Sequence, residues 1–368
     1  MNTTTTTRAL IGVLAFALIG PLPAAFAVQQ SKEDEVLLKA GSKQTGKVVA
    51  ENFDLLQLEI KKGGKQGIEW SKIASVKYCC LPLEFTEAMD ARTSDPEGAV
   101  PLLQALVTLE GLGDPGRQTA MCELAALQQR LGATDDAIKS WQALLAAYPE
   151  GRYLGVAARG LVDAYLGKEQ PAEAGKALDA LGGNPAASKF AALQPELKGL
   201  RARILMAQGK FADARAAFEQ VEKDATASPD ASAMAKLGVA ESLKAEGKTS
   251  EAETRFKALV EGEGPNFLLA GAWNGIGDLR SKAGADGRNA DLLWEGLYAY
   301  LRGVVQYAPA AGEPQDEYER ALAGSATCFR FLAQLETKKE VKAAHETSAN
   351  QQIDRLRKAF PNSKYLQK

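Results

Sequence analysis

The ten residues GKFADARAAF, Gly209–Phe218, decide the fold of this 368-residue chain. They predict a turn at the glycine and then a helix with Ala214 and Phe218 on one face, because residues four apart are neighbours on a helix. The segment GKTSEAETRF, Gly247–Phe256, repeats this pattern 38 residues later. A pattern that returns at a nearly constant interval predicts a repeat architecture in which each copy is one packing unit.

Five copies of the pattern align on an alanine in the second helix of each expected pair: Ala99, Ala137, Ala174, Ala214 and Ala252. The intervals between these alanines are 38, 37, 40 and 38 residues. Four residues after each alanine stands a large apolar residue: Leu103, Trp141, Leu178, Phe218 and Phe256. A helix pair cannot bury its apolar stripe alone, so these residues predict that each pair stacks on the next.

This register resembles the tetratricopeptide repeat (TPR), a helix-turn-helix unit with small and aromatic residues at fixed offsets. The resemblance covers residues 81–368 and implies a mainly α fold, an α-solenoid of about six helix pairs. The last pair is expected at Asp316–Leu335 and Lys338–Phe360, as a longer, more polar capping repeat. The segment that follows, Phe360–Tyr365, resembles the repeat-closing segment of exported bacterial proteins of this type, such as the periplasmic partners of the Tol–Pal system.

Residues 33–80 follow a period of two, which is typical of strands. Five short strands are expected here: Val36–Leu38, Gly46–Ala50, Leu55–Ile60, Ile68–Trp70 and Ile73–Tyr78. Turn signals separate them, and a short helical turn is expected at Trp70–Ile73. So many strands in so short a segment predict a small β-barrel-like module of SH3-like or Sm-like shape, because closure removes exposed strand edges.

The first 27 residues have the pattern of a signal peptide. Arg8 precedes the apolar run Ala9–Gly20, which is too short to span a bilayer, and Ala25–Ala27 is a small-residue cleavage site. We expect cleavage after Ala27, a spacer at 28–32, and an exported mature chain that is periplasmic or extracellular. An uncleaved membrane anchor is the alternative. No later stretch approaches transmembrane length, so no integral membrane segment is expected after cleavage.

No catalytic pattern stands out in the sequence. The only histidine, His345, lies in a polar helical pattern, and there is no nucleophile elbow, P-loop or dinucleotide-binding motif. The net charge is -2, and the lysines and arginines are spread along the chain without a basic block. We therefore expect no enzymatic activity, no cofactor, no bound metal and no nucleic-acid partner.

The chain has four cysteines, Cys79, Cys80, Cys122 and Cys328. An oxidising compartment permits disulfides. A bridge from Cys79 or Cys80 to Cys122 would tie the β module to the helical array, provided that the Cα atoms lie within about 7 Å. Cys122 and Cys328 fall inside helical patterns, where a buried free thiol is the alternative.

The TPR resemblance implies a concave groove lined by the first helix of each pair. The residues of these helices that point away from the pair contact are the candidates for partner binding: Gln129, Arg130, Arg159, Asp163, Arg203, Met206, Glu241, Lys244, Asn274 and Asp278. Their charges are mixed, and the family's clamp for a carboxylate is incomplete, so that ligand is not predicted.

We therefore expect a non-enzymatic scaffold that binds a protein or peptide of the cell envelope in the groove. The alternative is a structural or assembly protein that associates with itself. In that case the aromatic helix expected at Asp291–Tyr307 would supply an exposed patch.

Overall fold

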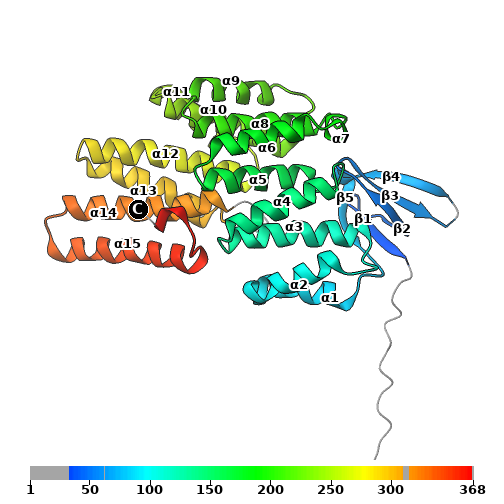
Figure 1. Cartoon of the computed structure of the whole chain (residues 1–368). Coiled ribbons are helices and arrows are strands. Elements are labelled where there is room, and N and C mark those ends of the chain that lie inside the picture. Colours follow the sequence, from blue (N-terminus) through cyan, green and yellow to red (C-terminus); the bar gives the residue numbers. More distant parts are fainter. Residues whose placement is uncertain (1–32, 62, 310–314, 367–368) are drawn as a thin grey trace, which may run out of the picture.

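The computed structural model describes residues 33–61, 63–309 and 315–366, so the expected signal peptide and spacer lie outside the described residues. A small β-sheet lies at one side of a curved array of paired helices (Figure 1). The strands are β1 (Asp34–Leu38), β2 (Lys43–Glu51), β3 (Leu55–Ile60), β4 (Gly64–Glu69) and β5 (Ile73–Lys77). A one-turn 3-10 helix, η1 (Trp70–Lys72), precedes β5 and confirms the predicted helical turn.

The five strands form an antiparallel sheet in the order β4-β3-β2-β1-β5. Strand β2 pairs with β1 in its first half and with β3 in its second half, and its register shifts between Val48 and Ala50. Such a bulge bends the strand, so that Val36 and Leu56 come together in one buried core. The five predicted strands are confirmed, but the sheet is open because β4 and β5 lie at its two edges. In β4 only Ile68 is buried, which leaves no second apolar side chain to pack across onto β5.

The helical array follows the sheet in the chain. Its helices are α1 (Leu83–Ser94), α2 (Pro96–Thr108), α3 (Asp114–Arg130), α4 (Thr134–Ala147), α5 (Leu154–Gly167), α6 (Pro171–Gly182), α7 (Pro185–Ser188), α8 (Leu193–Ala207), α9 (Phe211–Glu222), α10 (Pro229–Ala245), α11 (Thr249–Glu261), α12 (Asn266–Asp286), α13 (Ala290–Val305), α14 (Asp316–Leu335) and α15 (Lys339–Ala359). The short 3-10 helix η2 (Lys364–Leu366) follows α15.

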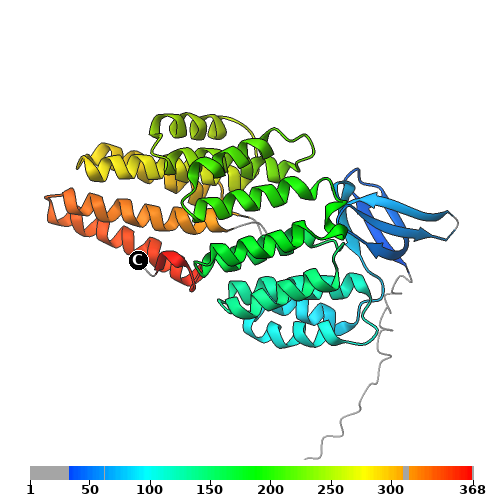
Figure 2. The same cartoon turned by 45° about the horizontal axis from the view of Figure 1, so that its top comes forward.

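Apart from the one-turn α7, the described helices form seven antiparallel pairs, which we call units 1 to 7 from α1/α2 to α14/α15. The repeat register of the sequence indicated about six. The expected last pair is confirmed, with α14 and α15 within one residue of the predicted bounds. Each unit contacts the next, and the stacking curves the array (Figure 2).

The contact between neighbouring units is the outer seam, formed by the aligned residues of the second helices. All five aligned alanines are completely buried, and the large residue four positions later is at most 5 % exposed. Where that residue is aromatic, its ring lies on a glycine of the following helix, where a Cβ would be closer than 3.0 Å to the ring. The pairs are Trp141 with Gly160, Phe218 with Gly238, and Phe256 with Gly275.

The turns between the two helices of a pair confirm the predicted use of glycine. Gly132, Gly209 and Gly247 have φ between 75° and 79°, a left-handed conformation that glycine adopts without steric conflict. In unit 3 this position is Glu169, which is held at φ 57°. Pro171 then begins α6, as expected for the first turn of a helix.

The β2–β3 turn fixes the sheet to the array. Phe53 donates a backbone hydrogen bond to the carbonyl of Glu150 at 2.9 Å, and its ring packs on Phe190 with centroids 5.5 Å apart. Beside it, the guanidinium of Arg152 lies 4.0 Å above the ring of Trp70. The module therefore docks on the loops between α4 and α5 and after α7, through aromatic contacts.

Candidate functional site

The inner face of the array is lined by the first helices of the pairs. Helices α3, α5, α8, α10, α12 and α14 contact one another in this order. The ten candidate residues lie on the first five of these helices. The structure shows which of them meet and which are already bound to other side chains.

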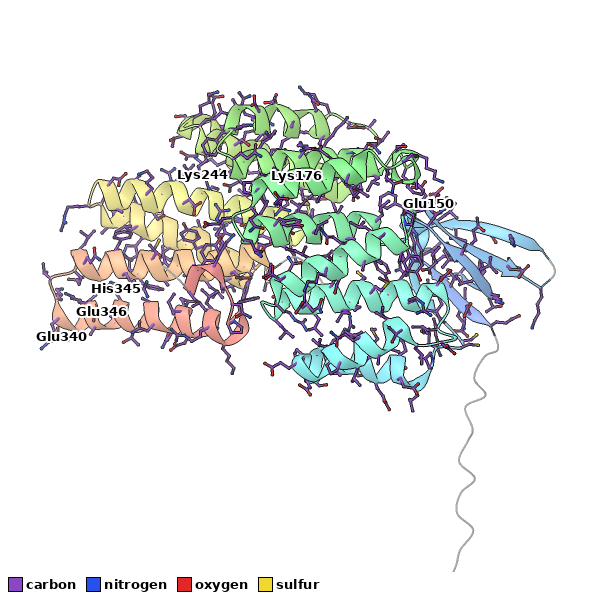
Figure 3. The ribbon with its side chains drawn as sticks, in the orientation of Figure 1. Glu150, Lys176, Lys244, Glu340, His345 and Glu346 are labelled. Carbon is purple, nitrogen blue, oxygen red and sulfur yellow. The ribbon has the colours of Figure 1, made fainter. Side chains whose placement is uncertain are left out.

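Four charged residues from three units form one cluster on this face. Lys244 on α10 contacts Glu241 at 2.6 Å and Asp278 on α12 at 2.6 Å. Arg320 on α14 of unit 7 contacts Glu241 of unit 5 at 3.0 Å, and it also contacts Asp278 of unit 6. Figure 3 labels Lys244 in this region. We call these four residues, together with Asn274, Tyr300 and Glu317, the inner-face network.

The other three members tie the network to the protein interior. The side-chain amide of Asn274 donates to the carbonyl oxygen of Glu317 at 2.7 Å and to its carboxylate at 2.8 Å. Asn274 is completely buried, and its Oδ1 has no hydrogen-bond partner among the described residues. The hydroxyl of Tyr300 donates to Asp278 at 2.5 Å. These bonds fix both acidic groups in place.

Burial and charge act in opposite directions on these carboxyl groups. For Asp278, burial alone would raise the pKa, but Arg320 and Lys244 outweigh it and lower the pKa to about 2. For Glu317, burial dominates over the favourable charge of Arg320, so the pKa is raised. Arg320 therefore joins a firmly ionised Asp278 to the carboxyl group of Glu317, which binds a proton more readily.

A second ion pair lies on the inner face of units 3 and 4. Arg203 on α8 contacts Asp163 on α5 at 2.6 Å. The charge of Asp316, the first residue of α14, acts on both of these groups. Arg159, one turn before Asp163, makes no hydrogen bond or ion pair within the described residues, although its charge acts on Asp163 and on Glu196. Among the described residues, Arg159 is thus the charged candidate that is not held by a hydrogen bond or ion pair.

The remaining candidates serve the packing of helices. Gln129 accepts a hydrogen bond from the indole of Trp141 at 3.0 Å, and Arg130 donates to the backbone carbonyl of Arg92 at 2.7 Å. The sulfur of Met206 accepts a hydrogen bond from the hydroxyl of Ser242 at 3.1 Å. Among the described residues, no hydrogen bond or ion pair joins these three residues to the inner-face network.

Sequence reasoning missed Tyr300, Glu317 and Arg320. They lie on α13 and α14, in the two longest units, where the repeat spacing no longer matches the earlier copies. The acidic start of α14, with Asp316, Glu317 and Glu319 ahead of Arg320, was the available signal. The sequence analysis interpreted these polar residues as a solvent-exposed cap and therefore did not place them on the inner face.

The four cysteines are free thiols in this structure, with Cys122 and Cys328 buried. Burial raises the pKa of each of these two thiols to about 12.

His345 packs edge-on against Trp294, with ring centroids 5.6 Å apart. Among the described residues no group of His, Cys, Asp and Glu side chains is arranged to hold a metal. No described helix is both long enough and apolar enough to cross a membrane.

The aromatic helix α13 is mostly committed to the core. Leu293, Leu297 and Tyr300 are buried against neighbouring helices, and only Tyr298 among its aromatic residues is exposed by more than half. The ring of Tyr298 stacks on Trp294 at 5.7 Å. The expected aromatic patch is thus reduced to one exposed ring with a partly covered neighbour.

Comparison with known proteins supports the repeat assignment. The sequence profile of the tetratricopeptide repeat family matches residues 119–151, which span most of α3, its turn and α4. The array is a TPR-like solenoid. No curated protein matches the chain.

Three solved structures illustrate the similarity of this TPR-like array to known proteins. A tetratricopeptide repeat protein from Parabacteroides merdae shares 15% identity over 73% of this chain and 100% of its own, with a TM-score of 0.41. PilW, a type IV pilus biogenesis factor, shares 16% identity over 68% of this chain and 96% of its own, with a TM-score of 0.40. Pseudomonas aeruginosa pilF shares 14% identity over 68% and 95%, with a TM-score of 0.37.

Proposed function

We propose that this protein is an exported, non-enzymatic scaffold that binds a protein or peptide of the cell envelope on the inner face of its array. The observation that carries the proposal is the stack of helix pairs, whose first helices present charged side chains on one continuous face. A solenoid of this kind offers an extended surface with several anchoring groups, which suits recognition of a chain segment.

Export and the envelope partner rest on the sequence. The segment 1–27 has the charge, apolar run and small-residue site of a cleaved signal, and it lies outside the described residues. Mass determination of the secreted or periplasmic chain tests this step directly. A mature N-terminus at Val28 supports it, and an intact N-terminus in the cytoplasm contradicts it.

Binding on the inner face is tested by one charge reversal and a matched control in unit 3. Arg159→Glu changes the charge of α5 on the inner face, where no described residue holds this arginine by a hydrogen bond or ion pair. Lys176→Glu makes the same change in charge on α6, where the lysine is 73% exposed and, among the described residues, pairs with Glu173 alone (Figure 3). Immobilised residues 28–368 of wild type and both variants are incubated with envelope extract, and the captured proteins are identified by mass spectrometry.

The proposal expects one protein that wild type and Lys176→Glu retain equally and that Arg159→Glu loses. Circular dichroism melting of the three proteins shows whether the loss follows from unfolding. Equal retention by Arg159→Glu, with an unchanged melting curve, contradicts binding on the inner face.

A further inference from the structure

Helix α14 does more than continue the stack. A first helix of unit 7 is expected to contact α12 of unit 6, and it does so. In addition, Arg320 contacts Glu241 of unit 5, 79 residues earlier in the chain, and its side chain is only 16% exposed. The charge of Asp316 acts on Asp163 and Arg203 in units 3 and 4. The start of α14 therefore lies across the inner face.

The segment that follows α15 extends this closure to unit 2. Asn362 lies against the turn between α3 and α4, where its side-chain amide is 3.0 Å from the position of a Cβ on Gly132. Ser363 is buried, and Tyr365 is partly buried within the influence of Arg320, Glu317 and Asp278.

The closing contacts differ in kind from those that hold unit 7 together. Phe360, Tyr365 and Leu366 pack on an apolar cluster that includes Val304 of α13 and Leu356 of α15. The closing segment thus belongs to the last unit and moves with it. The contacts that cross the inner face are the ion pairs of Arg320 with Glu241 and Asp278 and the close approach of Asn362 to the turn at Gly132.

We infer that this structure is a closed state of the array, held by a latch that consists of Arg320 and the segment Phe360–Leu366, and that release of the latch opens the inner face to a partner. Without Arg320, Lys244 still pairs with Glu241 and Asp278, but no cation joins these two carboxylates to Glu317 on α14. The repulsion between Glu317 and the other two carboxylates then favours separation of α14 from α10. The closed and open states differ in the ion pairs of Arg320 and the contact of Asn362, while the apolar seam at α13 stays intact. The closed state is inferred without reference to the proposed function. The control of partner binding by the latch rests on the proposed function.

A cross-link measures the closed state without any partner. In the full mature chain with Cys80→Ser, which removes the exposed native thiol, Gly132→Cys and Asn362→Cys place two thiols at the closing contact. Oxidation is followed over time on a non-reducing gel. Arg320→Met removes the latch cation and keeps the apolar stem. Arg280→Met is the matched control, because Arg280 also pairs with two carboxylates, Glu253 and Glu295, away from the closing contact.

The closed state predicts rapid formation of an intramolecular cross-link. Arg320→Met is expected to slow it roughly tenfold by shifting the population towards the open state, and Arg280→Met is expected to leave the rate unchanged. Arg320→Lys, which keeps the charge but loses the forked guanidinium, is expected to give an intermediate rate. Absence of the cross-link in the parent overturns the closure, and an unchanged rate in Arg320→Met overturns the latch.

Unfolding of unit 7 is a separate outcome that hydrogen exchange distinguishes. If Arg320→Met keeps α15 protected while residues 128–136 and 360–366 exchange faster, the latch has opened as inferred. If α15 loses protection as well, Arg320 holds the unit itself together and the latch is refuted. Partner capture by the oxidised and reduced cross-linked protein then tests gating: equal capture refutes gating and leaves the closure standing.

Discussion

The outer seam and the inner face of the array hold the same units together by opposite means. At the seam, a completely buried alanine and a large apolar side chain four residues later recur in five units, and aromatic rings lie on glycines. On the inner face, ion pairs and hydrogen bonds join helices of different units, and no two units use the same set. The seam is apolar and repeats from unit to unit, whereas the inner face is polar and differs from unit to unit.

This difference separates stability from specificity. Apolar burial contributes free energy in proportion to the area removed from water, and any unit can use the same residues for it. Ion pairs that are partly buried contribute little net stability, but they are sensitive to the position and charge of each partner. The seam is thus suited to building the array, and the inner face to choosing what binds there and when.

The largest effect is expected from breaking the seam. Phe256→Ala removes a completely buried ring between units 5 and 6, and it leaves a cavity over Gly275. Loss of about 3–5 kcal/mol in the free energy of unfolding is expected. Urea denaturation followed by circular dichroism measures it. A loss below about 1 kcal/mol would show that the seam relaxes around the cavity and does not depend on the ring.

Two glycines provide a matched test of the same contact. Gly275→Ala places a methyl group against the ring of Phe256 and is expected to destabilise by about 1–3 kcal/mol. Gly199 lies inside α8, and apart from its own helix no described residue comes within 4 Å of a Cβ there, so Gly199→Ala is expected to stabilise by about 0.5–1 kcal/mol. The same sign for both substitutions would contradict the ring-on-glycine account.

The next effect comes from the inner-face network. Asp278→Asn preserves the volume of the side chain but removes the charge that Arg320, Lys244 and Tyr300 share, and about 2 kcal/mol of stability is expected to be lost. Asp179→Asn is the control, because this carboxylate is 66% exposed and pairs with Arg201 on the outside. The control is expected to lose less than about 1 kcal/mol. Equal losses would show that the network is an ordinary surface ion pair.

The contrast also explains what the sequence predicts and what it does not. The positions of Ala214 and Phe218 follow from a periodicity, because each unit must solve the same packing problem with similar residues. Arg320 is not repeated, and its contact with Glu241 depends on how tightly the whole array curves. Curvature is the sum of small rotations between units, which no local pattern encodes. For the same reason the sequence predicts Asn274 and Asp278 on the inner face but does not predict their contacts with Glu317 and Arg320 of α14.

The openness of the sheet is a similar case. Alternation in Leu55–Ile60 predicts a strand with one buried face, and the structure has it. Closure requires β4 and β5 to meet, and β4 has only Ile68 to bury. A count of strands does not reveal that β4 lacks a second apolar side chain to pack on β5. The glycines Gly64 and Gly67 do indicate that β4 is a weak core strand.

A smaller effect is expected from pH. The pKa of Asp278 is lowered from 3.8 to about 2 in the folded protein, because Arg320 and Lys244 outweigh its burial. A lowered carboxyl pKa contributes stability that is present above the unfolded value and is lost as pH falls through the folded value. The difference in unfolding free energy between wild type and Asp278→Asn is therefore expected to be full at neutral pH and to shrink by about 1–2 kcal/mol between pH of about 4 and 2. Urea denaturation of both proteins across this range measures it, and a constant difference would show that the charge of Asp278 does not stabilise the array.

The smallest effect concerns a position that belongs to neither surface, the turn within a pair. In unit 4 the turn has Gly209 at φ 75°, and the amide of Lys210 donates to the carbonyl of Leu205 at 2.9 Å. Unit 3 has the same backbone bond, from Gln170 to Tyr165 at 2.9 Å, but Glu169 stands at φ 57°. The two turns share the same backbone hydrogen bond and a left-handed residue, and they differ in the side chain at that residue.

Since an L-residue in this conformation costs about 1–2 kcal/mol and glycine gives back about 0.5–1 kcal/mol through the entropy of the unfolded chain, Glu169→Gly is expected to stabilise by roughly 0.5–1 kcal/mol. Glu169 is exposed and makes no side-chain hydrogen bond or ion pair within the described residues, so no contact opposes the gain. Gly209→Ala is the converse and is expected to destabilise by about 1 kcal/mol. If Glu169→Gly destabilises instead, the turn of unit 3 gains something from its glutamate that its backbone does not show, and the repeats are less equivalent than their seam suggests.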